Sequence, residues 1–119
     1  LTALDAATID QLQGAVGAVV LVRLIDRYVE FAGEKSTALA AAADTGDLAT
    51  VGRIAHMIAG TAGSIGFVAL GEAARAIQSA ARAPDGDAER TLAAARRIAA
   101  ATAESVAAAL ALAARVGPG

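Results

Sequence analysis

Alanine is the most frequent residue in this chain, at 36 of 119 positions, whereas aromatic residues occupy only three. Alanine has the highest helix propensity of all residues, and β-branched runs bounded by turn signals are absent. The composition therefore predicts an all-α protein. Because few side chains are large, its core must form by close approach of helices. A chain of this length is typical of one domain, and we expect a single domain over residues 1–119.

Turn signals and apolar spacing divide the first part of the chain into three predicted helices. Asp5 is placed to cap a short helix that runs to about Gln13, and Gly14 and Gly17 are expected to break it. A second helix is predicted to end near Gly33, and a third covers residues 34–45. The apolar positions of the second helix are Val20, Leu21, Leu24, Ile25 and Tyr28, and those of the third are Leu39, Ala42 and Ala43.

Three further helices follow. Gly46 is a predicted C-terminal stop and Asp47 a predicted N-cap, and the helix after Asp47 is expected to end at Gly63 and Gly66. The next helix covers about 68–83, with Leu70, Ala73, Ala74, Ile77 and Ala81 on one side. After the turn Pro84-Asp85-Gly86, Asp87 is expected to cap a last helix that reaches Val116, and residues 117–119 form a frayed tail. Short connections favour antiparallel neighbours, so we expect an antiparallel four-helix bundle with additional short N-terminal helices.

His56 is the only histidine, and its helix face carries small or basic neighbours. At about 100° per residue, the residues that fall within roughly 60° of His56 include Ala49, Gly52, Arg53, Gly60 and Gly63. The opposite side carries Val51, Ile54, Ile58, Thr61 and Ile65. The apolar side must face the core, so we expect the imidazole to face solvent. An outward-facing Gly60 contributes no packing and costs about 1 kcal/mol relative to alanine, which favours a role in clearing space beside the ring.

The segment from His56 to Gly66 resembles the motif of histidine phosphotransfer (HPt) domains, the phosphorelay intermediates of two-component signalling. That motif has the form His-x-Leu-Lys-Gly-Ser-Ser/Ala-x-x-Leu-Gly. The histidine, the branched aliphatic Ile58, Gly60 and the Ile-Gly end match, whereas Ala59 stands in place of the lysine. The resemblance extends over nearly the whole chain. It implies that His56 accepts a phosphoryl group from a receiver-domain aspartate and passes it to another receiver.

The resemblance also implies a role for Gln78. Residues 56 and 78 each lie eleven positions from Phe67, so an antiparallel hairpin that turns near Phe67 brings them level. Members of the family often place a glutamine here, in hydrogen-bonding distance of the histidine ring. Such a bond would orient the ring and determine which nitrogen is free to accept phosphate.

The family lysine offsets the charge of the phosphate, and nearby arginines are expected to replace it. Arg53 precedes His56 by one turn, and Arg82 shares a helix face with Gln78. Arg75 is a weaker candidate. Arginine can bind phosphate with two parallel hydrogen bonds, whereas lysine acts as a point charge. Position 59 lies about 60° from His56 on the helical wheel, which predicts an exposed side chain and a helix that accepts lysine there.

Several other classes of function are disfavoured. The net charge of −2 argues against nucleic acid or an anionic membrane as a partner. Without cysteine, and with no carboxylate three or four residues from the single histidine, a metal site is not expected. The longest uncharged run, residues 54–71, contains His56 and four glycines, so a membrane span there is disfavoured, and no signal peptide is evident. We expect a cytoplasmic protein.

The chain also lacks the parts of an autonomous kinase. It has no glycine-rich phosphate loop, no Walker lysine and no carboxylate cluster for Mg²⁺. We therefore expect a phosphocarrier with no cofactor of its own, and we expect Mg²⁺ on the partner receiver domain. The expected partners are response-regulator receiver domains and a hybrid histidine kinase, and the expected state is a monomer. Docking is expected through the face around His56, with Ile9 and Val16 as candidate exposed apolar contacts.

Two alternatives stay open. The first is a degenerate HPt-like module that binds a receiver domain without efficient phosphotransfer, and Ala59 is the observation that favours it. The second is the histidine-bearing dimerisation hairpin of a sensor kinase. That hairpin usually has an acidic residue directly after its histidine, whereas Met57 occupies this position here.

Overall fold

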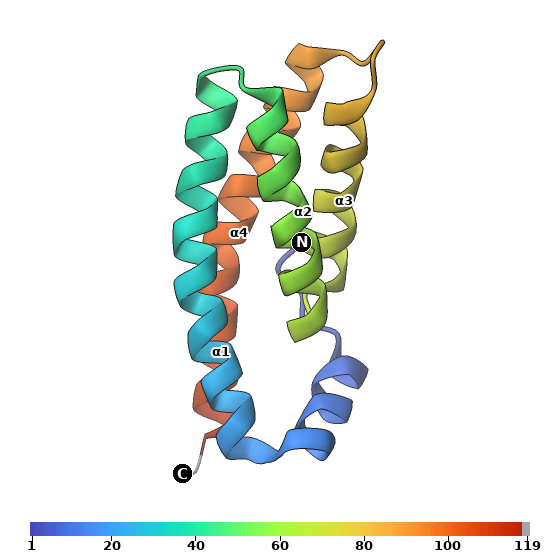
Figure 1. Ribbon diagram of the computed structural model, residues 1–119. Helices are drawn as coiled ribbons and strands as arrows, with labels where there is room; N and C mark the ends of the chain where they lie inside the picture. Colours follow the sequence, from blue (N-terminus) through green and yellow to red (C-terminus); the bar gives the residue numbers. More distant parts are fainter. Residues whose placement is uncertain (118–119) are drawn as a thin grey trace.

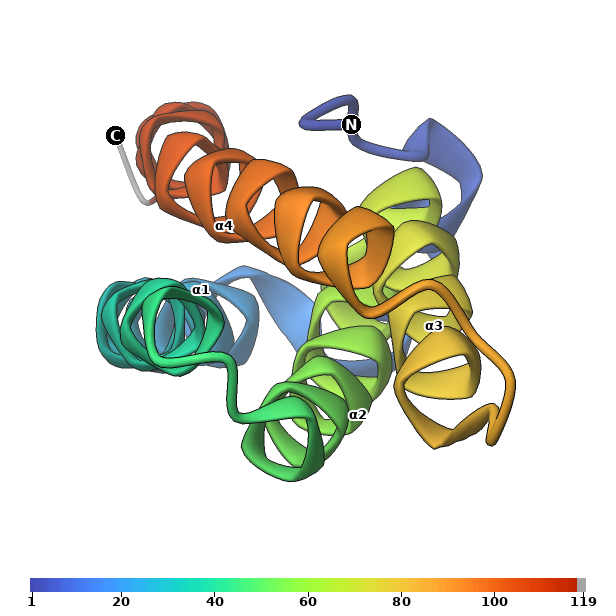
Figure 2. The same ribbon diagram turned by 90° about the horizontal axis from the view of Figure 1, so that it is seen from above.

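The computed structural model describes residues 1–117, which form four α-helices and, over this range, no strand (Figure 1). α1 spans Ala6–Asp44, α2 spans Leu48–Ile65, α3 spans Val68–Arg82 and α4 spans Ala88–Val116. Neighbouring helices run antiparallel, and the view from above shows the four axes packed around a common centre (Figure 2). The predicted all-α bundle is confirmed. The predicted frayed tail falls mostly on Pro118 and Gly119, which lie outside the described residues.

Local capping signals fix where three of the helices begin. Asp5, Asp47 and Asp87 each accept a hydrogen bond, at 3.1 Å, from the backbone N–H three residues further on. These bonds satisfy N–H groups that have no partner within the helix. α2 ends at Gly66, whose φ of 111° lies in the left-handed region, and Gly46 after α1 has a φ of 72°. All three predicted N-caps and both glycine stops are confirmed.

α1 departs from the sequence prediction because it is interrupted only once. The backbone leaves helical geometry at Gly17, with φ 82° and ψ 167°. The predicted breaks at Gly14 and Gly33 are wrong, since both residues lie within helical segments. Near Gly33 the helix is held by fully buried neighbours, Ala32 and Leu39. Burial of that face outweighs the cost of about 1 kcal/mol for a helical glycine.

The section of α1 before this break, residues 6–16, folds beneath α2 and α3 (Figure 1). The backbone N–H of Asp5 donates to the carbonyl of Gly66 at 2.8 Å. Ile9 packs against the same glycine, because a Cβ built there would lie 3.0 Å from Ile9 Cδ1. Ile9 is only 8% exposed, so the prediction that it is a free docking residue is wrong. Val16 is 36% exposed.

α2 and α3 approach closely because small residues line their contact. A Cβ built on Gly71 would lie 3.0 Å from the carbonyl oxygen of Ala59 and 3.3 Å from Cα of Gly63. One built on Gly52 would lie 3.4 Å from Cβ of Ala81. Gly52 and Gly63, two of the glycines near His56 on the helical wheel, therefore lie in or beside this contact. At this contact the core forms by close approach of two helix backbones, as the composition predicted.

The few large side chains fill the centre of the bundle. Tyr28 stacks on Phe67 with ring centroids 5.2 Å apart, and its hydroxyl lies 2.7 Å from Oγ of Ser105. Val20, which the apolar spacing placed in the core, is instead 39% exposed. The largest fully buried apolar side chains are Phe67, Leu21, Ile25, Leu39, Ile58, Leu70 and Val51.

Two helices, α1 and α4, are long and apolar enough, by length and composition alone, to cross a membrane. In the bundle they pack against each other. The core helices of a soluble bundle have the same length and composition, so this property alone decides nothing about a membrane.

Candidate functional site

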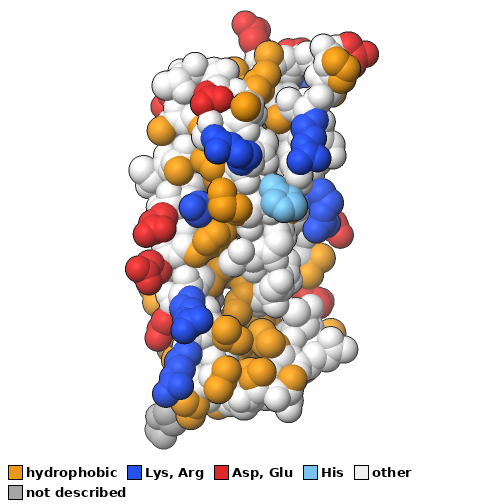
Figure 3. All heavy atoms as spheres, viewed as in Figure 1, with side chains coloured by type: hydrophobic (Ala, Val, Ile, Leu, Met, Phe, Trp, Pro, Cys, Tyr) orange, Lys and Arg blue, Asp and Glu red, His pale blue; other side chains and the backbone are white. Residues whose placement is uncertain are grey.

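His56 projects from the outer side of α2. The aliphatic residues predicted to face the core from this helix, Val51, Ile54, Ile58 and Ile65, are all buried. The opposite side of α2 must then face solvent, and the imidazole is exposed there. Figure 3 shows the ring standing out on the open face of the molecule, between basic side chains and an apolar strip.

Gln78 contacts this ring from α3. Its Oε1 lies 3.2 Å from His56 Nδ1. The close packing of α2 against α3 and the short turn at Gly66 set the register that brings the two residues level. An amide oxygen can only accept a hydrogen bond, so Nδ1 carries the proton in this arrangement. The other ring nitrogen, Nε2, then holds the free lone pair.

Gly60 leaves open space one turn after His56. A Cβ built at this position meets nothing within 4 Å, and the residue is exposed. Gly52 and Gly63, by contrast, lie against α3 or close to it. A Cβ built on Gly63 would also meet nothing within 4 Å, but Gly63 is half-buried, so Gly60 is the one of these three glycines that is exposed. Its environment allows a partner to approach the ring from this side.

The structure places Ala59 in the helix contact and not on the open face. Ala59 is 4% exposed, and its carbonyl faces Gly71 of α3. The prediction that position 59 is exposed is therefore wrong, and it was the ground for expecting the helix to accept lysine there. The helical wheel gave the correct angle from His56, but α3 covers that side of α2. A lysine here would have to displace α3 or bend around it.

Arg53 and Arg82 share a depression with His56, between α2 and α3. This depression has a volume of about 460 Å³, and no lysine, aspartate or glutamate lines it beside the two arginines. Arg75 is exposed but does not line it. One contact here was not predicted from the sequence. Nη2 of Arg53 donates a hydrogen bond to the hydroxyl of Thr50 at 2.8 Å. Thr50 thus holds the guanidinium toward the start of α2.

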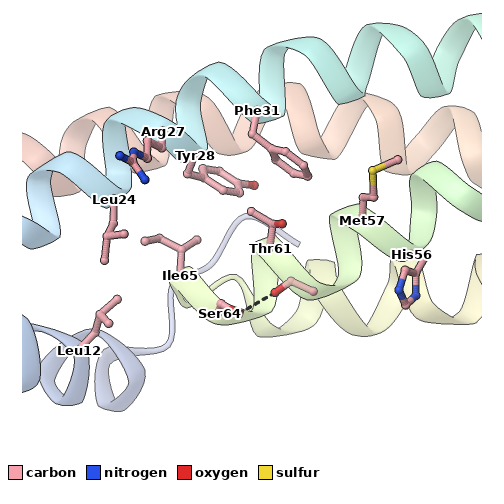
Figure 4. Close-up of a pocket in the computed structure, with 11 residues that line it drawn as sticks. Leu12, Leu24, Arg27, Tyr28, Phe31, His56, Met57, Thr61, Ser64 and Ile65 are labelled. Atoms are coloured by element: carbon pink, nitrogen blue, oxygen red, sulfur yellow. Dashed lines mark hydrogen bonds between the residues drawn. The ribbon is translucent and has the colours of Figure 1, made fainter.

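A larger groove of about 870 Å³ begins on the other side of His56 and runs between α1 and α2 (Figure 4). Sequence reasoning missed it. The spacing of Leu24, Tyr28 and Phe31 marked one side of α1, but nothing in the sequence showed that α2 would leave part of that side uncovered. The lining residues are Leu12, Leu24, Arg27, Tyr28, Phe31, His56, Met57, Gly60, Thr61, Ser64 and Ile65.

No group of three or more histidine, cysteine, aspartate or glutamate side chains that could hold a metal ion occurs within residues 1–117. The site around His56 thus consists of one imidazole, an amide, two guanidinium groups and an apolar groove. This combination provides a nucleophilic nitrogen and positive charge for an anion. Among the described residues it includes no second histidine, cysteine or carboxylate that could share a metal ion with His56.

A model of the Hpt domain family matches residues 23–114 of the chain. Among solved structures, the fold is similar to that of histidine-containing phosphotransfer protein B (HptB) from Pseudomonas aeruginosa PAO1. The TM-score is 0.80 at 24% sequence identity, over 94% of this chain and 95% of that one. A comparison with curated proteins gave no match. The family match includes His56, Gly60 and Gln78.

Proposed function

Because this chain belongs to the Hpt domain family, its role is histidine phosphotransfer within a phosphorelay, and we propose that His56 is its phosphoacceptor. The Nε2 lone pair attacks the phosphorus of an aspartyl phosphate on a receiver domain. A P–N bond forms as the acyl P–O bond breaks, and the aspartate leaves as a carboxylate. The reverse reaction, on a second receiver, passes the phosphoryl group onward.

The observation that carries this proposal is the contact between His56 Nδ1 and Gln78 Oε1 at 3.2 Å. Attack through Nε2 makes the ring cationic, with the remaining proton on Nδ1. The amide oxygen of Gln78 stabilises that proton and holds the ring in one orientation. Gly60 leaves room for the roughly in-line approach that phosphoryl transfer requires.

Arg53 and Arg82 supply the positive charge that the family lysine supplies elsewhere. Both line the depression that contains His56, on the α3 side of the ring. Guanidinium groups form short, charge-assisted hydrogen bonds with phosphate oxygens. The role of Ala59 is different from that of the lysine it replaces, because its side chain packs between α2 and α3.

The partner supplies the rest of the chemistry. A receiver domain would contribute the aspartate and a Mg²⁺ ion that offsets the charge of the phosphate, and it docks over the groove and the open face at Gly60. A hybrid histidine kinase is the proposed source of phosphate, and the protein acts as a cytoplasmic monomer. Another protein is proposed as the source of phosphate because the sequence has no ATP-binding motif, and the net charge of −2 disfavours an anionic membrane surface as a partner.

Transfer from a phosphorylated receiver to His56→Gln tests the proposal. The wild-type protein should acquire an acid-labile, base-stable phosphate, whereas the variant should acquire none and keep its helical circular dichroism spectrum. Label retained by the variant would refute the assignment. A wild-type protein that binds receivers but remains unlabelled with every receiver of its source organism would instead support the second candidate, a docking module that has lost transfer.

A further inference from the structure

The groove between α1 and α2 is mostly apolar, and α1 contributes positive charge at one edge of it. Arg27 is the only arginine, lysine, aspartate or glutamate that lines it. Arg27 is exposed. Within residues 1–117 the single ion pair joins Arg96 to Asp44, on another part of the molecule, so Arg27 has no acidic partner there.

Three acidic residues in the middle of α1 do not line the groove. Asp26, Glu30 and Glu34 repeat at four-residue spacing and so form one row along the helix. None of them lines the groove. Figure 3 shows acidic side chains along the outer edge of the molecule and basic ones between that edge and the apolar strip. The basic edge is therefore local, because the whole chain carries a net charge of −2.

We propose that this groove selects receiver domains whose docking helix carries an acidic residue beside an apolar face, and that Arg27 determines this specificity. The inference rests on the proposed function, because it names the kind of partner that reaches His56. Apolar side chains around Arg27 (Leu24 and Tyr28 among them) exclude water when the groove is covered. A carboxylate placed beside the guanidinium is then bound more strongly than at an open surface, and a basic residue is rejected.

The position of the acidic residue follows from the geometry of the groove. Arg27 and His56 lie toward opposite ends of it (Figure 4). α1 and α2 are antiparallel, with Leu24 near Ile65 and Tyr28 near Thr61, so Arg27 is level with about residue 62. That level is about 9 Å along the helix axis from His56, at 1.5 Å per residue. On the receiver's docking helix, the acidic residue should therefore lie about six residues from the helix end that faces the receiver's phosphoaspartate.

Binding measurements that do not depend on transfer test this inference. The probe is a receiver domain that binds the wild-type protein, and its affinity is measured by calorimetry in 50 mM and 500 mM NaCl. Arg27→Glu should weaken binding at least tenfold at low salt, and the difference should shrink at high salt as the charges are screened. Arg27→Lys should keep most of the affinity.

Arg97→Glu is the matched control, because Arg97 is exposed on α4 and lines neither the groove nor the depression beside His56. This variant should bind like wild type. Replacing the receiver's acidic residue with arginine should restore binding to Arg27→Glu. Equal affinity of wild type and Arg27→Glu, or an equal loss in Arg97→Glu, would overturn the inference while leaving transfer to His56 intact. Failure of every receiver to label or bind the protein would overturn both the inference and the proposed function.

Discussion

Glycines at positions 60 and 71 have opposite surroundings, although both lie in the α2–α3 pair. Position 60 has open space, whereas a Cβ at position 71 would lie 3.0 Å from a backbone oxygen. Gly60→Ala should raise the free energy of unfolding by about 0.5–1 kcal/mol, because alanine is the better helix former. Gly71→Ala should lower it by about 1–3 kcal/mol, because two backbones must separate. Urea unfolding measures both, and a destabilised Gly60→Ala would contradict this account of the site.

A larger side chain at position 60 should affect transfer without affecting folding. Gly60→Gln places a polar chain in the open space beside the imidazole, where the receiver must approach. We expect its melting temperature to be equal to or above that of wild type, and its rate of phosphorylation by a receiver to fall by more than tenfold. Rapid-quench transfer assays measure the rate. A normal rate in Gly60→Gln would show that clearance at this position is unimportant.

Restoring the family lysine should not restore a free positive charge. Ala59 is 4% exposed against α3, so Ala59→Lys overpacks the helix contact. We expect a loss of about 1–3 kcal/mol in unfolding free energy, and no gain in transfer rate. Arg53→Ala provides the comparison, because it should slow transfer while leaving stability nearly unchanged. A stable, faster Ala59→Lys variant would mean that the lysine bends out to solvent and that Arg53 and Arg82 do not fully compensate.

At the scale of the element, the start of α2 makes stability depend on pH. Hydrogen bonds from the hydroxyl and then the backbone N–H of Thr50 lower the pKa of Asp47 below its ordinary value. The pKa of Asp47 is thus lower in the folded than in the unfolded protein. Its contribution to stability is therefore complete above about pH 4 and is lost as the pH falls through the folded-state value.

Asp47→Asn should retain the cap but remove this pH dependence, since asparagine caps helices about as well as aspartate. Urea unfolding at pH 6 and pH 2.5 should show a smaller difference for Asp47→Asn than for wild type. Asp26→Asn is the control, because Asp26 is exposed and caps no helix. A pH dependence that is unchanged in Asp47→Asn, or reduced equally in Asp26→Asn, would contradict this role for the cap.

The same elements show which features a sequence can predict. Capping depends on residues within one turn, so the N-cap at Asp47 was predictable. The position of Gln78 beside His56 was predictable because a short turn joins the two helices in a fixed register. The continuity of α1 through Gly33 was not, because it depends on what buries the flanking residues. The burial of Ala59 likewise depends on the closeness of α3, which the helical wheel of α2 alone does not contain.

At the scale of the whole molecule, unequal helix lengths shape the site. α1 and α4 have 39 and 29 residues, whereas α2 and α3 have 18 and 15. Residues 6–16 fold under the short pair and contribute Leu12 to the groove that leads to His56. Composition predicted the bundle, but the groove arises from how these lengths and the break at Gly17 combine. The docking surface is therefore a property of the assembled molecule.

The central claim is that His56 accepts the phosphoryl group on Nε2. The most direct test is to determine which nitrogen of the imidazole carries that group. The protein is prepared with ¹⁵N-labelled histidine, phosphorylated by a receiver domain and studied by ¹⁵N and ³¹P NMR. Because His56 is the only histidine, the ring signals need no further assignment. The account predicts one-bond coupling between phosphorus and Nε2, with a proton retained on Nδ1 by Gln78. Coupling to Nδ1, or a phosphorylated protein whose histidine shows no coupling at all, would contradict it.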